Sequence, residues 1–182
     1  YGQSSAPRDP AAYDLLTLCG DIQAAMDMLG QREVAVVHAV MAADAGAEIV
    51  FHAPRIRMKA GAGAVDLAQL LKTEAQERFG TGSLDAVILA CGSTLLDMDG
   101  LCSAMSGLGV SDSLLPGERL YGYGESCGTL LALGLAKEML QGESSPARAY
   151  ILGSRQVPLR RVGVVSLDEQ GQFGALVMER RA

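Results

Sequence analysis

Hydrophobic and polar positions along the chain follow strand-like and helix-like patterns in turn. Residues 84–94 (LDAVILACGST) form a continuous apolar run, which predicts a strand covered on both faces. Residues 65–80 carry apolar side chains at helical spacing, which predicts an amphipathic helix that ends at Gly80. The basic, Gly-rich residues 55–64 predict a surface loop. Further helices are expected at residues 9–29, 99–110 and 126–142, and further strands at residues 33–40, 47–53, 147–154, 161–168 and 173–180.

This alternation, closed by a series of strands, indicates a layered α/β domain. The expected helix at 126–142 has small residues on more than one side, among them Gly128, Ala132, Gly134 and Ala136. Small residues let backbones approach closely, so we expect this helix to lie between layers of a sandwich that a partner subunit completes. Residues 1–31 are expected to form an N-terminal helical segment, and residues 32–182 the main domain.

Composition narrows the class of protein. Of 182 residues, 49% are hydrophobic and 20% are charged, which is typical of a folded globular chain. The apolar runs are too short to span a bilayer, and a net charge of −6 without a Lys/Arg cluster argues against binding to nucleic acid or anionic membranes. Cys19, Cys91, Cys102 and Cys127 form no CxxC pair and have no histidine at metal-ligand spacing, so we expect reduced thiols in a cytoplasmic protein without a metal or cofactor.

Three stretches of the second half occur in a recognisable order: DAVILACGSTLLDMDG, GYGESCGTLLALGLAKEML and RVGVVSLDEQGQFGALVMER. With EVAVVHAVMAADAGAEIVF upstream, they resemble the C-terminal half of a β-ketoacyl synthase of the thiolase-like superfamily. In that family a strand ends at a His-Gly-Thr-Gly-Thr turn followed by Asn-Asp, a second Gly-His turn opens a buried helix, and a Gly-rich turn leads into the last strand. The matching residues here are Gly92, Ser93, Thr94 and Asp97, then Gly124 and Gly128, then Gly171. The resemblance implies a thiolase-like layered sandwich, of which this chain forms one α/β/α half.

The departures from the family concern its chemistry. Cys91 and Glu125 stand where ketosynthases carry the two histidines that support decarboxylation and condensation. A thiol is a weak hydrogen-bond donor, and a carboxylate repels a developing enolate. The half that carries the family's nucleophile is also missing from the chain. The resemblance therefore implies a subunit like the chain length factors of type II polyketide systems, including aryl polyene systems, which pair with an active ketosynthase and shape its acyl cavity without catalysing a step.

Two groups of residues could serve such a subunit. Met98, Leu101, Met105 and Leu108 either line the acyl tunnel or are core residues at helical spacing. Arg55, Arg57 and Lys59 either dock an acidic acyl carrier protein or lie on a solvated loop.

Other polar residues have simpler interpretations. Asp97 and Asp99 fit helix capping better than acid–base chemistry, and His38 fits a hydrogen-bonded core or interface position. His52 lies near a loop and fits either a surface or an interface.

A rival interpretation makes the chain an enzyme. Cys127 precedes an apolar helix, whose positive N-terminal end would activate a thiol as the nucleophile of a thiolase-like acyltransferase, with Glu125 as an accessory group. A third interpretation is a remnant that only stabilises or recruits a partner.

Overall fold

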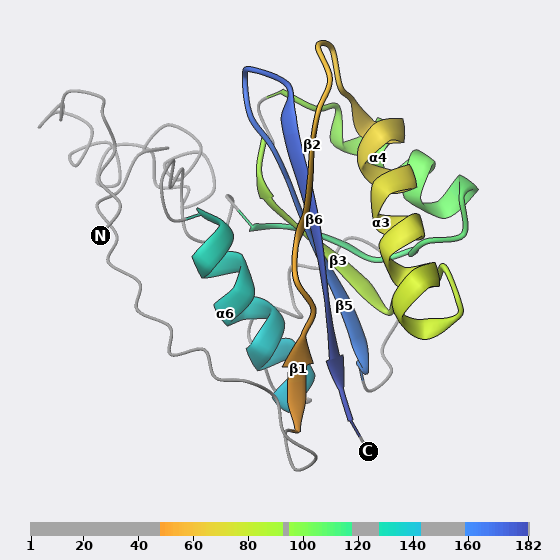
Figure 1. The fold of residues 1–182 in the computed structure, drawn as a ribbon, viewed down its shortest axis with the longest axis vertical. Helices are drawn as coiled ribbons and strands as arrows, with labels where there is room; N and C mark the ends of the chain where they lie inside the picture. Colours follow the sequence, from red (N-terminus) through yellow and green to blue (C-terminus); the bar gives the residue numbers. More distant parts are fainter. Residues whose placement is uncertain (1–47, 93–94, 118–127, 143–158, 182) are drawn as a thin grey trace, which may run out of the picture.

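The computed structural model describes residues 48–92, 95–117, 128–142 and 159–181 (Figure 1). The expected helix at 9–29 and the expected strands at 33–40 and 147–154 lie outside the described residues, as does the whole segment 1–31.

A six-stranded mixed sheet forms the centre of the described structure. Its strands are β1 (Ile49–Phe51), β2 (Arg55–Met58), β3 (Ala86–Cys91), β4 (Leu114–Pro116), β5 (Arg161–Leu167) and β6 (Gln172–Arg180). The order is β1-β6-β5-β3-β4, and β2 pairs with the other end of β6, so β1 and β2 together make one edge. The pairings β3–β4 and β3–β5 are parallel, whereas β6 is antiparallel to β5, β1 and β2. Among the described strands, β6 therefore runs against all the others.

Helices cover both faces of this sheet. Helices α3 (Ala64–Phe79) and α4 (Met98–Gly107) lie on one face, and α6 (Gly128–Gln141) lies on the other (Figure 1). The prediction of a layered α/β domain is confirmed at this level.

The helix ends follow from their capping residues. Gly80 ends α3 in the left-handed conformation, with φ 69°, and its N–H donates to the carbonyl oxygen of Gln76. Asp97 caps the start of α4, where its carboxylate accepts hydrogen bonds from the N–H groups of Asp99 and Gly100 at 3.2 and 3.0 Å. The capping role expected for Asp97 is confirmed.

The core has two parts, one on each side of β3. Residues Ala86 to Ala90 of β3 are fully buried, as expected for a strand covered on both faces. Val87 and Leu89 pack with α3 and α4, whereas Ile88 packs with α6.

Two short strands differ from the sequence predictions. The loop predicted for residues 55–64 is wrong at its start, because Arg55–Met58 pair with Gln172–Ala175 of β6. Pro54, which has no N–H to donate, stands between β1 and β2 at the edge of the sheet. Strand β4 was not predicted, because only three residues, Leu-Leu-Pro, belong to it.

Two strand glycines on opposite faces give a matched stability prediction. A Cβ at Gly163 would lie 2.8 Å from Leu84 Cδ1 and 2.9 Å from Leu71 Cδ1, whereas at Gly174 the nearest atoms would lie at 3.6 Å. We expect Gly163→Ala to lower the free energy of unfolding by about 1–3 kcal/mol through overpacking. Gly174→Ala should raise it by about 0.4–1 kcal/mol, because alanine restricts the unfolded chain. Pulse proteolysis in urea at low protein concentration measures both, and equal effects of the two variants would contradict the packing described here.

Candidate functional site

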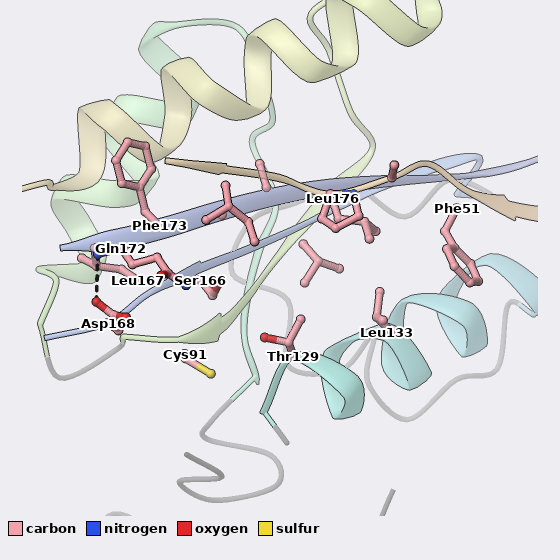
Figure 2. Close-up of a pocket in the computed structure, with 16 residues that line it drawn as sticks. Phe51, Cys91, Thr129, Leu133, Ser166, Leu167, Asp168, Gln172, Phe173 and Leu176 are labelled. Carbon is pink, nitrogen blue, oxygen red and sulfur yellow. Dashed lines mark hydrogen bonds between the residues drawn. The ribbon is translucent and has the colours of Figure 1, made fainter. Parts of the chain in front are cut away.

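A cavity of about 620 Å³ lies between α6 and the part of the sheet made by β5, β6, β1 and β2 (Figure 2). Most of its wall is apolar, with side chains from the edge strands, from β5 and β6 and from α6: Phe51, Pro54, Ile56, Val164, Leu176 and Leu133. Polar groups also line it: Cys91, Thr129, Ser166, Asp168 and Gln172. Cys91 and Thr129 come from the end of β3 and the start of α6 (Figure 2).

The end of β3 and the start of α6 meet at this cavity. A Cβ at Gly128 would lie 2.6 Å from Cys91 Sγ and 3.2 Å from the carbonyl oxygen of Ala90, so only glycine lets α6 begin this close to β3. Cys91, which precedes the first turn of the ketosynthase resemblance, and Gly128, which follows the second, are therefore adjacent in space.

Cys91 faces the cavity because β3 is irregular at its end. The pairing with β5 shifts register between Leu89 and Cys91, and both Ala90 and Cys91 pack on the α6 side of the sheet. A regular strand would turn the second of these two residues to the opposite face. Gly92 follows with φ 100°, and a Cβ there would lie 2.7 Å from the carbonyl oxygen of Leu167, so this turn is held against the end of β5.

The carboxylate of Asp168, which lines the cavity, holds the turn between β5 and β6. Asp168 Oδ1 accepts hydrogen bonds from the N–H groups of Gln170 and Gln172 at 2.9 and 2.8 Å, which closes the turn between β5 and β6 (Figure 2). Gly171, the residue matched to the family's third turn, lies in this hairpin with φ 80°.

The chemistry at the described lining is sparse. It consists of the Cys91 thiol, the hydroxyls of Thr129 and Ser166, the amide of Gln172 and the Asp168 carboxylate that closes the β5–β6 turn. No histidine lines the cavity in the described ranges. Glu125 and Cys127 lie outside the described residues, as do Ser93 and Thr94, so their roles stay predictions.

Thr129 and Ser166 were not found from the sequence. Ser166 follows three valines and a glycine in β5, and a polar residue in an otherwise apolar strand was the available signal. Thr129 carried no such signal, because a threonine in the first turn of a helix is common.

The expected tunnel residues lie elsewhere. Leu101 and Met105 are buried between α4, α3 and the sheet, and Met98 and Leu108 pack against the same core. None of the four lines the cavity next to α6. These are positions of core residues, the alternative that the sequence left open, and a tunnel role for them stays a prediction.

The basic residues of the edge are largely ion-paired within the chain. Arg55 Nε lies 2.5 Å from Glu74 Oε1, and its Nη2 donates to Glu77 Oε2 at 2.6 Å. The Glu74 contact is an ion pair without an aligned hydrogen bond. The hydrogen bond from Arg55 lowers the pKa of Glu77, so the stabilisation of its ionised form is lost as the pH falls through that lowered pKa.

Lys59 is similarly engaged, since its Nζ lies 2.7 Å from Asp66 Oδ1. Its hydrogen bond is the main reason that the pKa of Asp66 is lowered. Docking of an acyl carrier protein through these cations stays a prediction. Its acidic groups would compete for Arg55 and Lys59 with the carboxylates of this chain that already pair with them.

Two further candidates lie outside the cavity. His52 Nε2 is 3.5 Å from Glu179 Oε1, and its ring meets the edge of Phe79 at a centroid distance of 5.5 Å. Cys102 on α4 is a free thiol whose pKa is raised by burial and then by Asp99, so it stays protonated.

Comparisons with protein-family models, curated proteins and solved structures found no match to the chain. In the described ranges no helix combines the length and apolar character needed to cross a membrane. The same residues contain no group of three His, Cys, Asp or Glu side chains that could hold a metal ion.

The Arg55–Glu74 ion pair, which joins β2 to α3 outside the cavity, gives a stability prediction. Glu74 is only 1% exposed, so Arg55→Met should leave a buried carboxylate without its cation and destabilise the chain by about 3 kcal/mol. Adding Glu74→Gln should recover part of the loss. Arg57→Met, a neighbouring change on an exposed side chain, is the control and should stay within about 0.5 kcal/mol. Equal urea midpoints for Arg55→Met and Arg57→Met would show that the pair contributes nothing.

The contact between β3 and α6 at the cavity gives a second stability prediction. Gly128→Ala should cost about 1–3 kcal/mol, because its Cβ meets Cys91 Sγ. In the double variant Gly128→Ala/Cys91→Ala the sulfur is gone, and we expect partial recovery, limited by the carbonyl oxygen of Ala90. The control double variant Gly128→Ala/Cys102→Ala removes a thiol on the other face of the sheet and should recover none of the lost stability. Rescue by both cysteine variants, or by neither, would refute the proposed contact.

Proposed function

We propose that the chain is a non-catalytic subunit of the chain-length-factor kind. It pairs with an active β-ketoacyl synthase in elongation of the type II polyketide or fatty-acid kind, aryl polyene systems included, and helps to shape the space for the acyl chain. The cytoplasmic location expected from the sequence belongs to the same proposal.

The convergence of Cys91 and Gly128 at one apolar cavity carries this proposal. The resemblance places the two catalytic histidines of a ketosynthase at the turn after this strand and at the turn before this helix. Here the first position is Cys91, and the described lining offers no histidine in its place. The second position is Glu125 in the sequence. An apolar cavity with this lining supports holding or shaping an acyl chain, with no bond made by this subunit.

The sheet supports the finer fold proposal, a thiolase-like half. The resemblance implies an α/β/α half, and the described mixed sheet lies between α3 and α4 on one face and α6 on the other. Among the described strands, β6 is the last and is antiparallel to all its neighbours.

Exposed apolar side chains among the described residues support the proposal that the chain binds a partner. Phe51 is 39% exposed, Ile56 is 60% exposed and Leu130 is 37% exposed, and all three lie on or beside the α6 face. Among the exposed large apolar side chains of the described residues, Phe51 and Ile56 line the cavity and Leu130 lies on α6, whereas Met58, Val65 and Leu95 lie elsewhere. Exposed apolar side chains beside a cavity are compatible with a surface that another chain covers.

A thiolase-like acyltransferase is the second candidate, and one observation favours it. Helix α6 begins at Gly128, so Cys127 is the residue immediately before a helix N-terminus in the sequence. The positive end of a helix lowers the pKa of a thiol placed there.

Co-expression with a ketosynthase tests the proposal. We expect a stable heterodimer by size-exclusion mass analysis, whereas the chain alone should aggregate, because its apolar face stays uncovered. Removing the chain should change the length of the product that the ketosynthase makes. A monodisperse monomer whose presence alters neither the mass of the ketosynthase nor its product would refute the proposal.

Cys127→Ala separates the two candidates. The subunit proposal expects unchanged product formation by the complex and no acyl label on this chain. Loss of activity together with loss of acyl labelling would assign the nucleophile to Cys127, and Cys102→Ala is the matched control because Cys102 lies on the other face of the sheet.

A further inference from the structure

The cavity beside α6 has one polar end and one apolar end. Its polar side chains near the turn between β5 and β6 are Cys91, Ser166, Asp168 and Gln172 (Figure 2). The side chains towards its other end are apolar: Phe51, Leu133 and Leu176 (Figure 2). Thr129, on the first turn of α6, lies between the two groups (Figure 2). An apolar wall with a few polar groups is the usual form of a small-molecule site, and here the polar groups gather at one end.

The pairing of β5 with β6 produces this change of polarity along the floor of the cavity. Ser166 pairs with Gly174, and Val164 pairs with Leu176 one step further along the same face. Gln172 and Leu176 both line the cavity and lie four residues apart in β6, which is about 13 Å. A ligand that follows this floor is therefore elongated, with a polar head near Ser166 and an apolar tail over Leu176.

The polar end offers hydrogen-bond donors to a ligand. Ser166 is partly exposed and Thr129 is exposed, and both line the cavity. A Cβ at Gly174 would lie 3.6 Å from Ser166 Oγ, so a longer side chain in place of this glycine would reach over the hydroxyl. The hydroxyls of Ser166 and Thr129 can each donate to a carbonyl oxygen.

The charges at the polar end favour a head without a charge of its own. The described lining contains no Lys, Arg or His side chain, so an anionic head would enter the cavity without a counter-ion from these residues. The carboxylate of Asp168 would also repel it. A cationic head would instead meet the positive N-terminal end of α6 beside Thr129. A carbonyl group avoids both penalties, because it is neutral and its oxygen accepts hydrogen bonds from the two hydroxyls.

We propose that this cavity holds an acyl thioester, with its uncharged carbonyl group beside Ser166 and Thr129 and its alkyl tail towards Phe51 and Leu133. That the ligand is an acyl group rests on the proposed function, whereas the charge of its head and its direction follow from the lining. This chain makes and breaks no bond in the ligand. It binds the carbonyl group by hydrogen bonds and the tail by apolar contact.

A photoreactive acyl probe tests the direction of the ligand. Decanoyl-N-acetylcysteamine with a diazirine near the end of its alkyl chain is added to the complex with a ketosynthase, or to the chain alone at low concentration if no complex forms. After irradiation, the labelled residues are identified by mass spectrometry. We expect labels at Phe51 or Leu133, because the tail lies at the apolar end, and none at Ser166 or Gln172.

A probe with a charged head tests the preference for a neutral one. Decanoic acid with the same diazirine is an anion at neutral pH, and it should label Phe51 and Leu133 at least ten-fold less than the thioester does.

A charge introduced at the polar end should change this preference. Thr129→Lys adds a cation at an exposed position and should raise labelling by the anionic probe at least five-fold. Thr129→Gln, a long side chain without the charge, is the matched control and should leave labelling as in the wild type. Val65→Lys adds the same charge at a residue 66% exposed on α3, at the other face of the sheet, and should also leave labelling unchanged.

The outcomes separate this ligand from the proposed function. If the complex forms and its product changes, but neither Phe51 nor Leu133 is labelled or both probes label them equally, only the ligand inference is overturned. If no complex forms, the proposed function is wrong. Selective labelling of the lone chain by the thioester would then still support the cavity as a site for a neutral acyl group, and its absence would overturn both.

Discussion

The burial of strand β3 is the constraint on which the rest of the structure depends. Ala86, Val87, Ile88, Leu89 and Ala90 have no contact with water, so the sheet must be covered on both faces at its centre. Helices α3 and α4 provide this cover on one side, and α6 provides it on the other. Full burial of a side chain such as Leu89 or Ile88 contributes about 1.5–3 kcal/mol to the free energy of unfolding. Loss of the helices on either face would expose side chains of β3, so the stability of the three layers is coupled at this strand. The cavity lies beside α6 on this same face of the sheet.

Elements with a clear period and a marked end could be predicted from the sequence. Helix α3 has its apolar stripe and Gly80, α4 has Asp97 at its start, and β3 is apolar throughout. The edge strands could not be predicted in the same way. Residues of β2 pair with β6 more than a hundred positions away in the chain, and local sequence does not show such a partner. The buried carboxylate of Glu74 is a related case, because its partner Arg55 lies on that edge strand.

The sequence predicted the two turns that meet at the candidate site, but not the residues that line its cavity. Order and spacing of glycines placed Cys91 and Gly128 in two related turns, and the structure brings them into contact. The sequence could not indicate that β3 is irregular at Cys91, which decides the side that the thiol faces. The sequence also could not indicate that Leu101 and Met105 of α4 belong to the core on the α3 side of the sheet. Methionine at helical spacing suits a core and a ligand tunnel equally.

The interruption of the β1–β2 edge at Pro54 has a consequence for how the protein behaves in a crowded solution. Exposed sheet edges are templates for runaway strand addition, the first step towards fibrils. This edge is split into segments of three and four residues, its break is a residue that cannot donate a backbone hydrogen bond, and Arg55, Arg57 and Lys59 follow the break. The split and the proline therefore leave only short stretches of β1 and β2 to which a further strand could add.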